Sequence, residues 1–104
     1  MYFLSLDFPK IIPFSFPYLV NLNTANLVVS CSLSSGSKPI VIEWLKNGQL
    51  MTKSDHRVTF KTEDMFSVLI IKDLKLDDIG NYTCVAKNTF GSDQYTSSLI
   101  IRCK

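Results

Sequence analysis

Three cysteines carry most of the chemistry available to this chain of 104 residues. Trp44 follows Cys31 by thirteen residues, and Cys84 closes the run Asp78-Ile79-Gly80-Asn81-Tyr82-Thr83-Cys84, a D-x-G-x-Y-x-C pattern. Cys103, the third cysteine, is expected to be either a buried free thiol or a reactive surface thiol. The sequence has no Cys-x-x-Cys or His-x-x-x-His spacing and no glycine-rich phosphate loop, so it predicts neither a zinc site nor a nucleotide site.

The order of these residues is typical of an immunoglobulin-like sandwich of two antiparallel β-sheets. In that fold the two cysteines lie on facing strands, so we predict a Cys31–Cys84 disulfide with Trp44 packed against it in the core. Tyr82 is expected to turn its hydroxyl back onto the corner that precedes its strand. The bridge should contribute about 4 kcal/mol in the chain-entropy model, and its persistence predicts an extracellular domain.

Acid–base and metal chemistry find little support among the other side chains. His56 is the single histidine, and a lone histidine in a polar loop is usually solvated, the alternative being a pH-sensitive contact. The acidic pairs Glu63-Asp64 and Asp77-Asp78 fall where turns are expected, which favours solvated turns over a calcium site. Eleven basic and nine acidic residues create no field that would attract nucleic acid. We expect no enzyme, metal, cofactor or small-molecule substrate.

Alternation of apolar and polar residues predicts the strands that position these side chains. The expected inward residues are Leu27, Val29, Cys31 and Leu33, then Ile40, Ile42 and Trp44, then Val58 and Phe60, then Leu69, Ile71 and Leu74, then Tyr82, Cys84 and Ala86, and finally Leu99 and Ile101. The stretch between Trp44 and Val58 has room for only one short strand, which we expect at residues 49–51. This length indicates an intermediate-set sandwich rather than a variable-type one. Pro13 and Pro17 are expected to interrupt the first strand where it moves between the sheets.

The length fits one domain. We expect a single domain over residues 10–104 and an N-terminal extension over residues 1–9. The extension either docks against the sandwich or is not a native part of the protein. No apolar run reaches the roughly 18–20 residues of a membrane-spanning helix, and the first seven residues lack the features of a signal peptide. The chain is therefore expected to be part of a larger secreted or membrane-anchored protein.

Outward positions of the strand at residues 66–72 depart from the polar pattern of the other strands. Because Leu69 and Ile71 point inward, their neighbours must point outward, and another outward apolar residue lies on the strand at residues 27–33. The resulting apolar patch contains Val28, Val68 and Ile70, with Ser30, Lys61 and Lys72 around it. It favours an interface over β-propensity alone. A rival patch is expected on the other sheet from Val41, Leu45, Val85 and Ile100, and the sequence does not choose between the two.

The segment Pro-Lys-Ile-Ile-Pro-Phe-Ser-Phe-Pro at residues 9–17 resembles the opening of one immunoglobulin domain of the arthropod Down syndrome cell adhesion molecules, Dscam. The resemblance covers residues 10–102 and continues through residues 31–36, 42–48, 66–74 and 80–86. The chain is similar to the variable seventh domain of insect Dscam and to the variable N-terminal domain of the shortened Dscams of chelicerates.

This resemblance implies homophilic recognition, in which two copies of one isoform pair antiparallel through one sheet face. Four strands form that face: A near residues 10–12, B at residues 27–33, E at residues 66–72 and D near residues 58–60. By position, the contacting residues would be Lys10 and Ile12 on A, Val28 and Ser30 on B, Thr59 and Lys61 on D, and Val68 and Ile70 on E. Domains with this motif also pair an arginine, here Arg57, with the aspartate Asp78. The alternatives are a heterophilic receptor or immune-recognition module, or a structural spacer.

Asn81-Tyr82-Thr83 is an acceptor sequence for N-glycosylation. Because Tyr82 points inward, Asn81 is expected to face solvent and to be modifiable in a secretory host.

Overall fold

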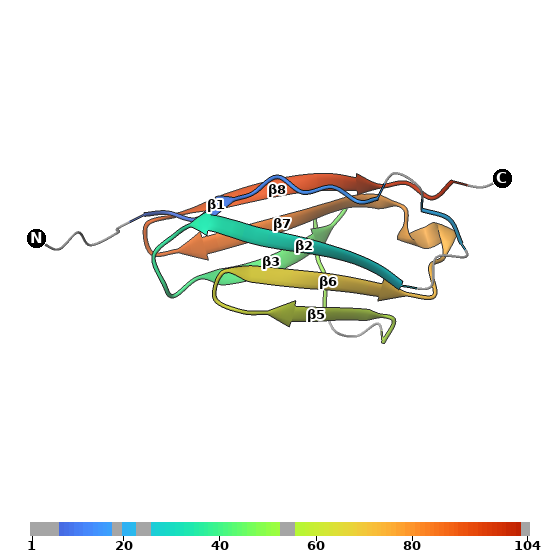
Figure 1. Cartoon of the computed structure of the whole chain (residues 1–104), viewed down its shortest axis with the longest axis horizontal. Helices are drawn as coiled ribbons and strands as arrows, with labels where there is room; N and C mark the ends of the chain where they lie inside the picture. The colour runs from blue at the N-terminus through green and yellow to red at the C-terminus, as the bar shows by residue number, and fades with distance from the viewer. Residues whose placement is uncertain (1–6, 18–19, 23–25, 53–55, 103–104) are drawn as a thin grey trace, which may run out of the picture.

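A computed structural model describes residues 7–17, 20–22, 26–52 and 56–102 of the chain. The strands form two four-stranded antiparallel sheets that pack face to face (Figure 1). The strand orders are β1-β2-β6-β5 in the first sheet and β4-β3-β7-β8 in the second. The predicted all-β sandwich is confirmed, and the first sheet corresponds to the expected A, B, E and D strands.

The sheets contain strands of very different length. The first sheet contains β1 (Lys10–Ile11), β2 (Asn26–Ser35), β6 (Phe66–Lys72) and β5 (Val58–Thr62). The second contains β4 (Gln49–Leu50), β3 (Val41–Lys46), β7 (Gly80–Asn88) and β8 (Gly91–Leu99). A 3₁₀ turn, η1 (Leu76–Asp78), lies between β6 and β7. Asn47 and Gly48 join β3 to β4 with φ angles of 50° and 83°, the positive values that a type I′ hairpin requires.

The core lies between the two sheets and is closed by a disulfide. Cys31 of β2 is bonded to Cys84 of β7, and Trp44 of β3 is buried opposite Cys84. Most of the expected inward residues are buried, but Ile40, Val58 and Phe60 are only half-buried. Val58 and Phe60 belong to β5, which has a strand on one side only, and Ile40 precedes β3, so each of the three lacks a covering neighbour.

A buried serine satisfies the indole of Trp44. The indole Nε1 of Trp44 donates to Oγ of Ser67, on the opposite sheet, at 2.9 Å. The same Ser67 oxygen lies 2.9 Å from the hydroxyl oxygen of Thr62. Ser67 is fully buried on β6. A buried indole N–H without a partner would be destabilising, so this hydrogen bond removes a cost and also links the sheets.

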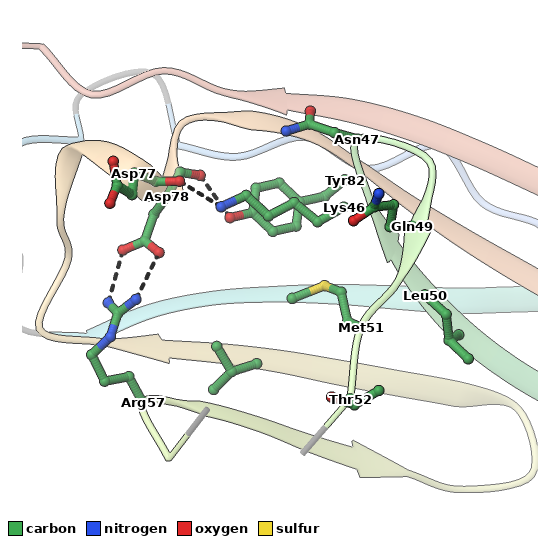
Figure 2. Close-up of a pocket in the computed structure, with 11 residues that line it drawn as sticks. Lys46, Asn47, Gln49, Leu50, Met51, Thr52, Arg57, Asp77, Asp78 and Tyr82 are labelled. Atoms are coloured by element: carbon green, nitrogen blue, oxygen red, sulfur yellow. Dashed lines mark hydrogen bonds and ion pairs between the residues drawn. The ribbon is translucent and has the colours of Figure 1, made fainter. Parts of the chain in front are cut away.

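The corner between η1 and β7 is held by one aspartate. The guanidinium of Arg57 donates to both carboxylate oxygens of Asp78, at 2.9 and 3.0 Å (Figure 2). The backbone N–H of Lys75 donates to one of these oxygens. The hydroxyl of Tyr82 donates to the backbone carbonyl of Asp78 at 2.6 Å. Burial by itself raises the pKa of Asp78, but the hydrogen bonds from Arg57 and Lys75 outweigh it and hold the pKa below its ordinary value of 3.8. Burial and the charge of Asp78 raise the pKa of Tyr82.

The first strand leaves its sheet soon after it begins. Lys10 and Ile11 pair with β2, whereas the carbonyl of Val20 accepts the backbone N–H of Arg102 at 2.7 Å, beyond the end of β8. Pro13 and Pro17 have no N–H to donate, and the described residues between Ile11 and Val20 form no regular strand. The segment follows the expected path from the first sheet toward the second (Figure 1).

Two aromatic residues of this segment fill the core. Phe14 packs edge-on against Trp44, with ring centroids 5.7 Å apart, and Phe16 packs in the same way against Tyr82 at 5.3 Å. Part of the expected extension is also fixed. The carbonyl of Asp7 accepts hydrogen bonds from the side-chain amide of Asn88 and the backbone N–H of Ser37.

Replacing both bridge cysteines, Cys31→Ala and Cys84→Ala, should lower the free energy of unfolding by roughly 2–5 kcal/mol, because the unfolded chain regains the entropy of the closed loop. Urea denaturation followed by tryptophan fluorescence measures the change. Peptide mapping of the parent chain that finds Cys103, outside the described residues, paired with either cysteine would contradict the assignment.

The corner predicts a dependence of stability on pH. The folded-state pKa of Asp78 is depressed, so its contribution is present above the unfolded pKa and is lost as pH falls through the lower folded pKa. Asp78→Asn should cost about 3 kcal/mol near neutral pH, because it removes the charged carboxylate that accepts two hydrogen bonds from the half-buried Arg57. It should also flatten the loss of stability below about pH 4.

The matched control is Asp64→Asn, which removes an ion pair to Lys38 whose side chains are both mostly exposed. Such a pair contributes little, so the unfolding profile should hardly change. If the two substitutions lowered the free energy of unfolding equally, the Arg57–Asp78 pair would contribute no more to stability than an exposed ion pair.

Candidate interaction surface

Strand register arranges the outward side chains of the first sheet in cross-strand rows. Val28 of β2 lies opposite Ile70 of β6, and Ile70 lies opposite Thr59 of β5. Directly opposite residues on one face of a sheet contact each other. The next row on the same face contains Ser30, Val68 and Lys61. The structure therefore brings together, on adjacent strands of one face, the residues expected on β2, β5 and β6.

The central strand of this face is partly shielded by its neighbours. Val28 is 51% exposed, whereas Val68 and Ile70 are half-buried because β6 lies between β2 and β5. Ser30 and Lys61 are exposed. The face is thus apolar along β6 and polar toward the free edge of β5.

The β1 side of the face is continuous with these rows. Lys10 and Ile12 are exposed and lie on either side of the buried Ile11. The backbone N–H of Ile12 donates to the carbonyl of Ser32 on β2 at 2.8 Å, so this residue still follows the sheet edge. The ammonium of Lys10 lies 5.9 Å from the centre of the Phe8 ring, a cation–π contact at the margin of the face.

One further residue of this face was missed by the sequence reasoning. Phe66 begins β6, is 39% exposed, and pairs with Ser32 of β2. It lies two residues before Val68, so the same alternation could have placed it outward. We refer to the following residues together as the apolar patch of the first sheet: Ile12, Val28, Phe66, Val68 and Ile70.

The rival patch expected on the second sheet is not continuous. Val85 is only 9% exposed, which corrects its placement as a surface residue. It lies in the middle of β7, between Glu43 of β3 and Gln94 of β8, so a strand flanks it on each side. The most exposed members, Val41 and Ile100, lie at opposite ends of the sheet, because Val41 pairs with Lys87 whereas Ile100 follows Leu99, the partner of Gly80.

A cavity of about 550 Å³ opens between the β3–β4 turn and the Arg57–Asp78 corner (Figure 2). Three of its polar side chains donate hydrogen bonds within the protein: Arg57 to the carboxylate of Asp78, Tyr82 to the carbonyl of Asp78, and Lys46 to the carbonyl of Asp77. Across the described part of the chain no three His, Cys, Asp or Glu side chains gather as a metal site. The exposed His56 stands outside the cavity lining.

Comparison with known proteins identifies the family. Residues 23–101 match the model described as the immunoglobulin I-set domain. The chain is 37% identical over 94 residues to cell adhesion molecule DSCAML1 of Homo sapiens, which covers 90% of this chain and 4% of that protein. A crystal structure of the Dscam1 Ig7 domain, isoform 5, superposes with a TM-score of 0.82 at 35% identity, covering 91% of this chain and 97% of that one. The chain is an immunoglobulin I-set domain of the Dscam family.

Other relatives define the limits of this likeness. Cell adhesion molecule DSCAM of Rattus norvegicus is 37% identical over 95 residues, and this I-set domain again spans only 4% of that protein. A titin fragment, I67-I69, superposes with a TM-score of 0.81 at 20% identity, which shows the shared fold alone. Membership of the Dscam family is consistent with a role in cell adhesion or recognition. Among the described residues no helix is long and apolar enough to cross a membrane.

Proposed function

We propose that this domain mediates cell adhesion by binding a second copy of itself through the outer face of the first sheet. The observation that carries the proposal is the apolar patch of the first sheet, which follows β6 without interruption. The Dscam membership supports an adhesive role. The partner is the same domain of an identical isoform on an apposed cell, and the parent chain is extracellular and membrane-anchored.

The composition of the face suits an antiparallel pair with two-fold symmetry. A two-fold interface is self-complementary, so residues near the axis meet their own copies. With the axis close to β6, Val68 and Ile70 would lose water against apolar partners, which gives affinity. Lys10 and Lys61 lie toward the margins of the face, where their ammonium groups would stay hydrated when two identical isoforms pair. In a pair of different isoforms the same charges would meet unsuitable neighbours and disfavour binding.

One such face gives a weak contact by itself. A few side chains on three adjacent strands bury less area than a stable complex requires. Adhesion between cells would then arise from many copies engaged at once, since linked contacts raise the effective concentration of each. The Cys31–Cys84 bridge supports an extracellular setting, because disulfides persist in oxidising compartments.

A heterophilic function has one specific observation in its favour. Phe90 is half exposed at the β7–β8 turn, and the side-chain oxygen of Asn88 accepts the backbone N–H groups of Phe90 and Gly91. These hydrogen bonds constrain the backbone of the turn that carries the aromatic ring. A foreign protein could bind it there.

The homophilic proposal predicts that Ile70→Lys abolishes self-association of the domain. The substitution would place two ammonium groups close together in an apolar contact, where each loses water without gaining a partner, a penalty of roughly a few kcal/mol. Sedimentation equilibrium measures the change, and circular dichroism checks that the monomer stays folded.

Two variants serve as controls. Ile100→Lys on the second sheet and Phe90→Ser on the β7–β8 turn should leave self-association unchanged. If Ile100→Lys prevents self-association and Ile70→Lys does not, the second sheet is the interface. If the parent domain stays monomeric at high concentration, the homophilic proposal is wrong.

Phe66 provides an independent test, since it extends the apolar patch. Phe66→Ser should weaken self-association by about tenfold, because an exposed aromatic side chain of this size contributes about 1–2 kcal/mol when it becomes buried. The same sedimentation assay measures the effect. Unchanged association would place Phe66 outside the contact.

A further inference from the structure

We propose that Asn81 carries an N-linked glycan that covers one end of the second sheet's outer face and leaves the first sheet free to pair. The inference rests on the extracellular role proposed above, because this modification occurs in the secretory pathway. Asn81-Tyr82-Thr83 is the one N-x-S/T acceptor sequence in the chain.

The geometry of the Asn81 amide suits a carbohydrate. Asn81 is exposed on β7 and pairs with Ser98 of β8. The hydroxyl of Ser98 donates to Oδ1 of Asn81 at 2.6 Å, which fixes the amide plane. The amide nitrogen Nδ2 makes no hydrogen bond to any described residue, and it is the atom that a glycan would occupy.

The modification leaves these contacts intact. A lipid-linked oligosaccharide supplies the sugar: Nδ2 forms a bond to C1 of N-acetylglucosamine while the bond from C1 to the oxygen of the lipid pyrophosphate breaks. The lipid pyrophosphate leaves and takes up the proton that Nδ2 loses. The substituted amide keeps its carbonyl oxygen and one N–H. Oδ1 therefore still accepts the hydrogen bond from Ser98, and the backbone N–H of Asn81 still donates to Oδ1 of Asn47.

The third residue of the acceptor sequence sets the order of events. The Thr83 hydroxyl lies 2.7 Å from that of Thr96, and Thr83 is buried. A transferase that must contact this hydroxyl would reach it only before β7 pairs with β8. Transfer thus precedes folding, and the fold has only to accommodate the attached sugar at the exposed Asn81.

Two exposed isoleucines lie beside the site. Ile79 comes two residues before Asn81 and is 43% exposed, and Ile100 comes two residues after Ser98 and is 56% exposed. Ile79 directly precedes β7 and Ile100 directly follows β8, so both lie next to the end of the ladder that holds the Asn81–Ser98 pair. A glycan would cover both side chains and keep other proteins from this end of the sheet. Asn81 lies on β7 of the second sheet, whereas β6 and the apolar patch belong to the first sheet.

The test is secretion of the 104-residue chain from insect cells behind a cleavable leader, with Asn81→Gln and Thr83→Val as variants. We expect a mass increment that peptide-N-glycosidase removes, leaving aspartate at position 81, and that both variants lack. Thr83→Val retains Asn81, so loss of the increment there ties the sugar to the acceptor sequence. A secreted, folded chain with an unmodified Asn81 would overturn the inference.

Self-association of the glycosylated chain and of Asn81→Gln then tests the role of the sugar. The dissociation constants should agree within about twofold, since the glycan lies on the sheet that does not pair. A glycosylated chain that associates at least about tenfold more weakly than Asn81→Gln would overturn the shielding role and point to the second sheet as the interface. If neither form associates, the homophilic function is wrong, whereas the mass increment still demonstrates the glycan at Asn81.

Discussion

The bond between Cys31 and Cys84 joins the two sheets near the middle of their length, and the rest of the structure is arranged around it. Trp44 lies opposite Cys84, and its indole donates to Ser67 on the far sheet, so a covalent and a polar link cross the same small core. Phe14 then packs on Trp44 and ties the segment after β1 to this centre. A domain of this size buries limited apolar surface, so such cross-links contribute a large share of its stability.

Closing the core in this way also determines the surface. Successive strand residues point to opposite faces, so burying Ser67, Leu69 and Ile71 of β6 obliges Phe66, Val68 and Ile70 to face outward. An inward polar residue is tolerated because Ser67 has partners in Trp44 and Thr62. Among the described residues, no second layer of the sandwich covers the outward apolar side chains of β6. This uncovered apolar surface is the physical basis for assigning an interface to this face.

The outer faces of the two sheets differ in how continuous their apolar surface is. On the second sheet an ion pair between Lys87 and Glu43 lies beside the buried Val85, and the two most exposed residues of the rival patch, Val41 and Ile100, are at opposite ends. The first sheet keeps its charged residues at the margins. Binding through the first sheet and covering of the second by carbohydrate would therefore be complementary uses of one sandwich. The corner of Arg57, Asp78 and Tyr82 belongs to neither face, and its ion pair and hydrogen bond stabilise the fold.

The sequence by itself determined the bridge, the burial of Trp44 and Tyr82, the alternation of most strands and, through a family motif, the partnership of Arg57 with Asp78. These features follow from local patterns and fixed spacings. Only the tertiary structure decided that Val85 is covered and that Ser67 satisfies Trp44. Each of these depends on which residues of distant segments lie opposite one another, and strand register is set by packing of the whole sandwich, which no local pattern contains.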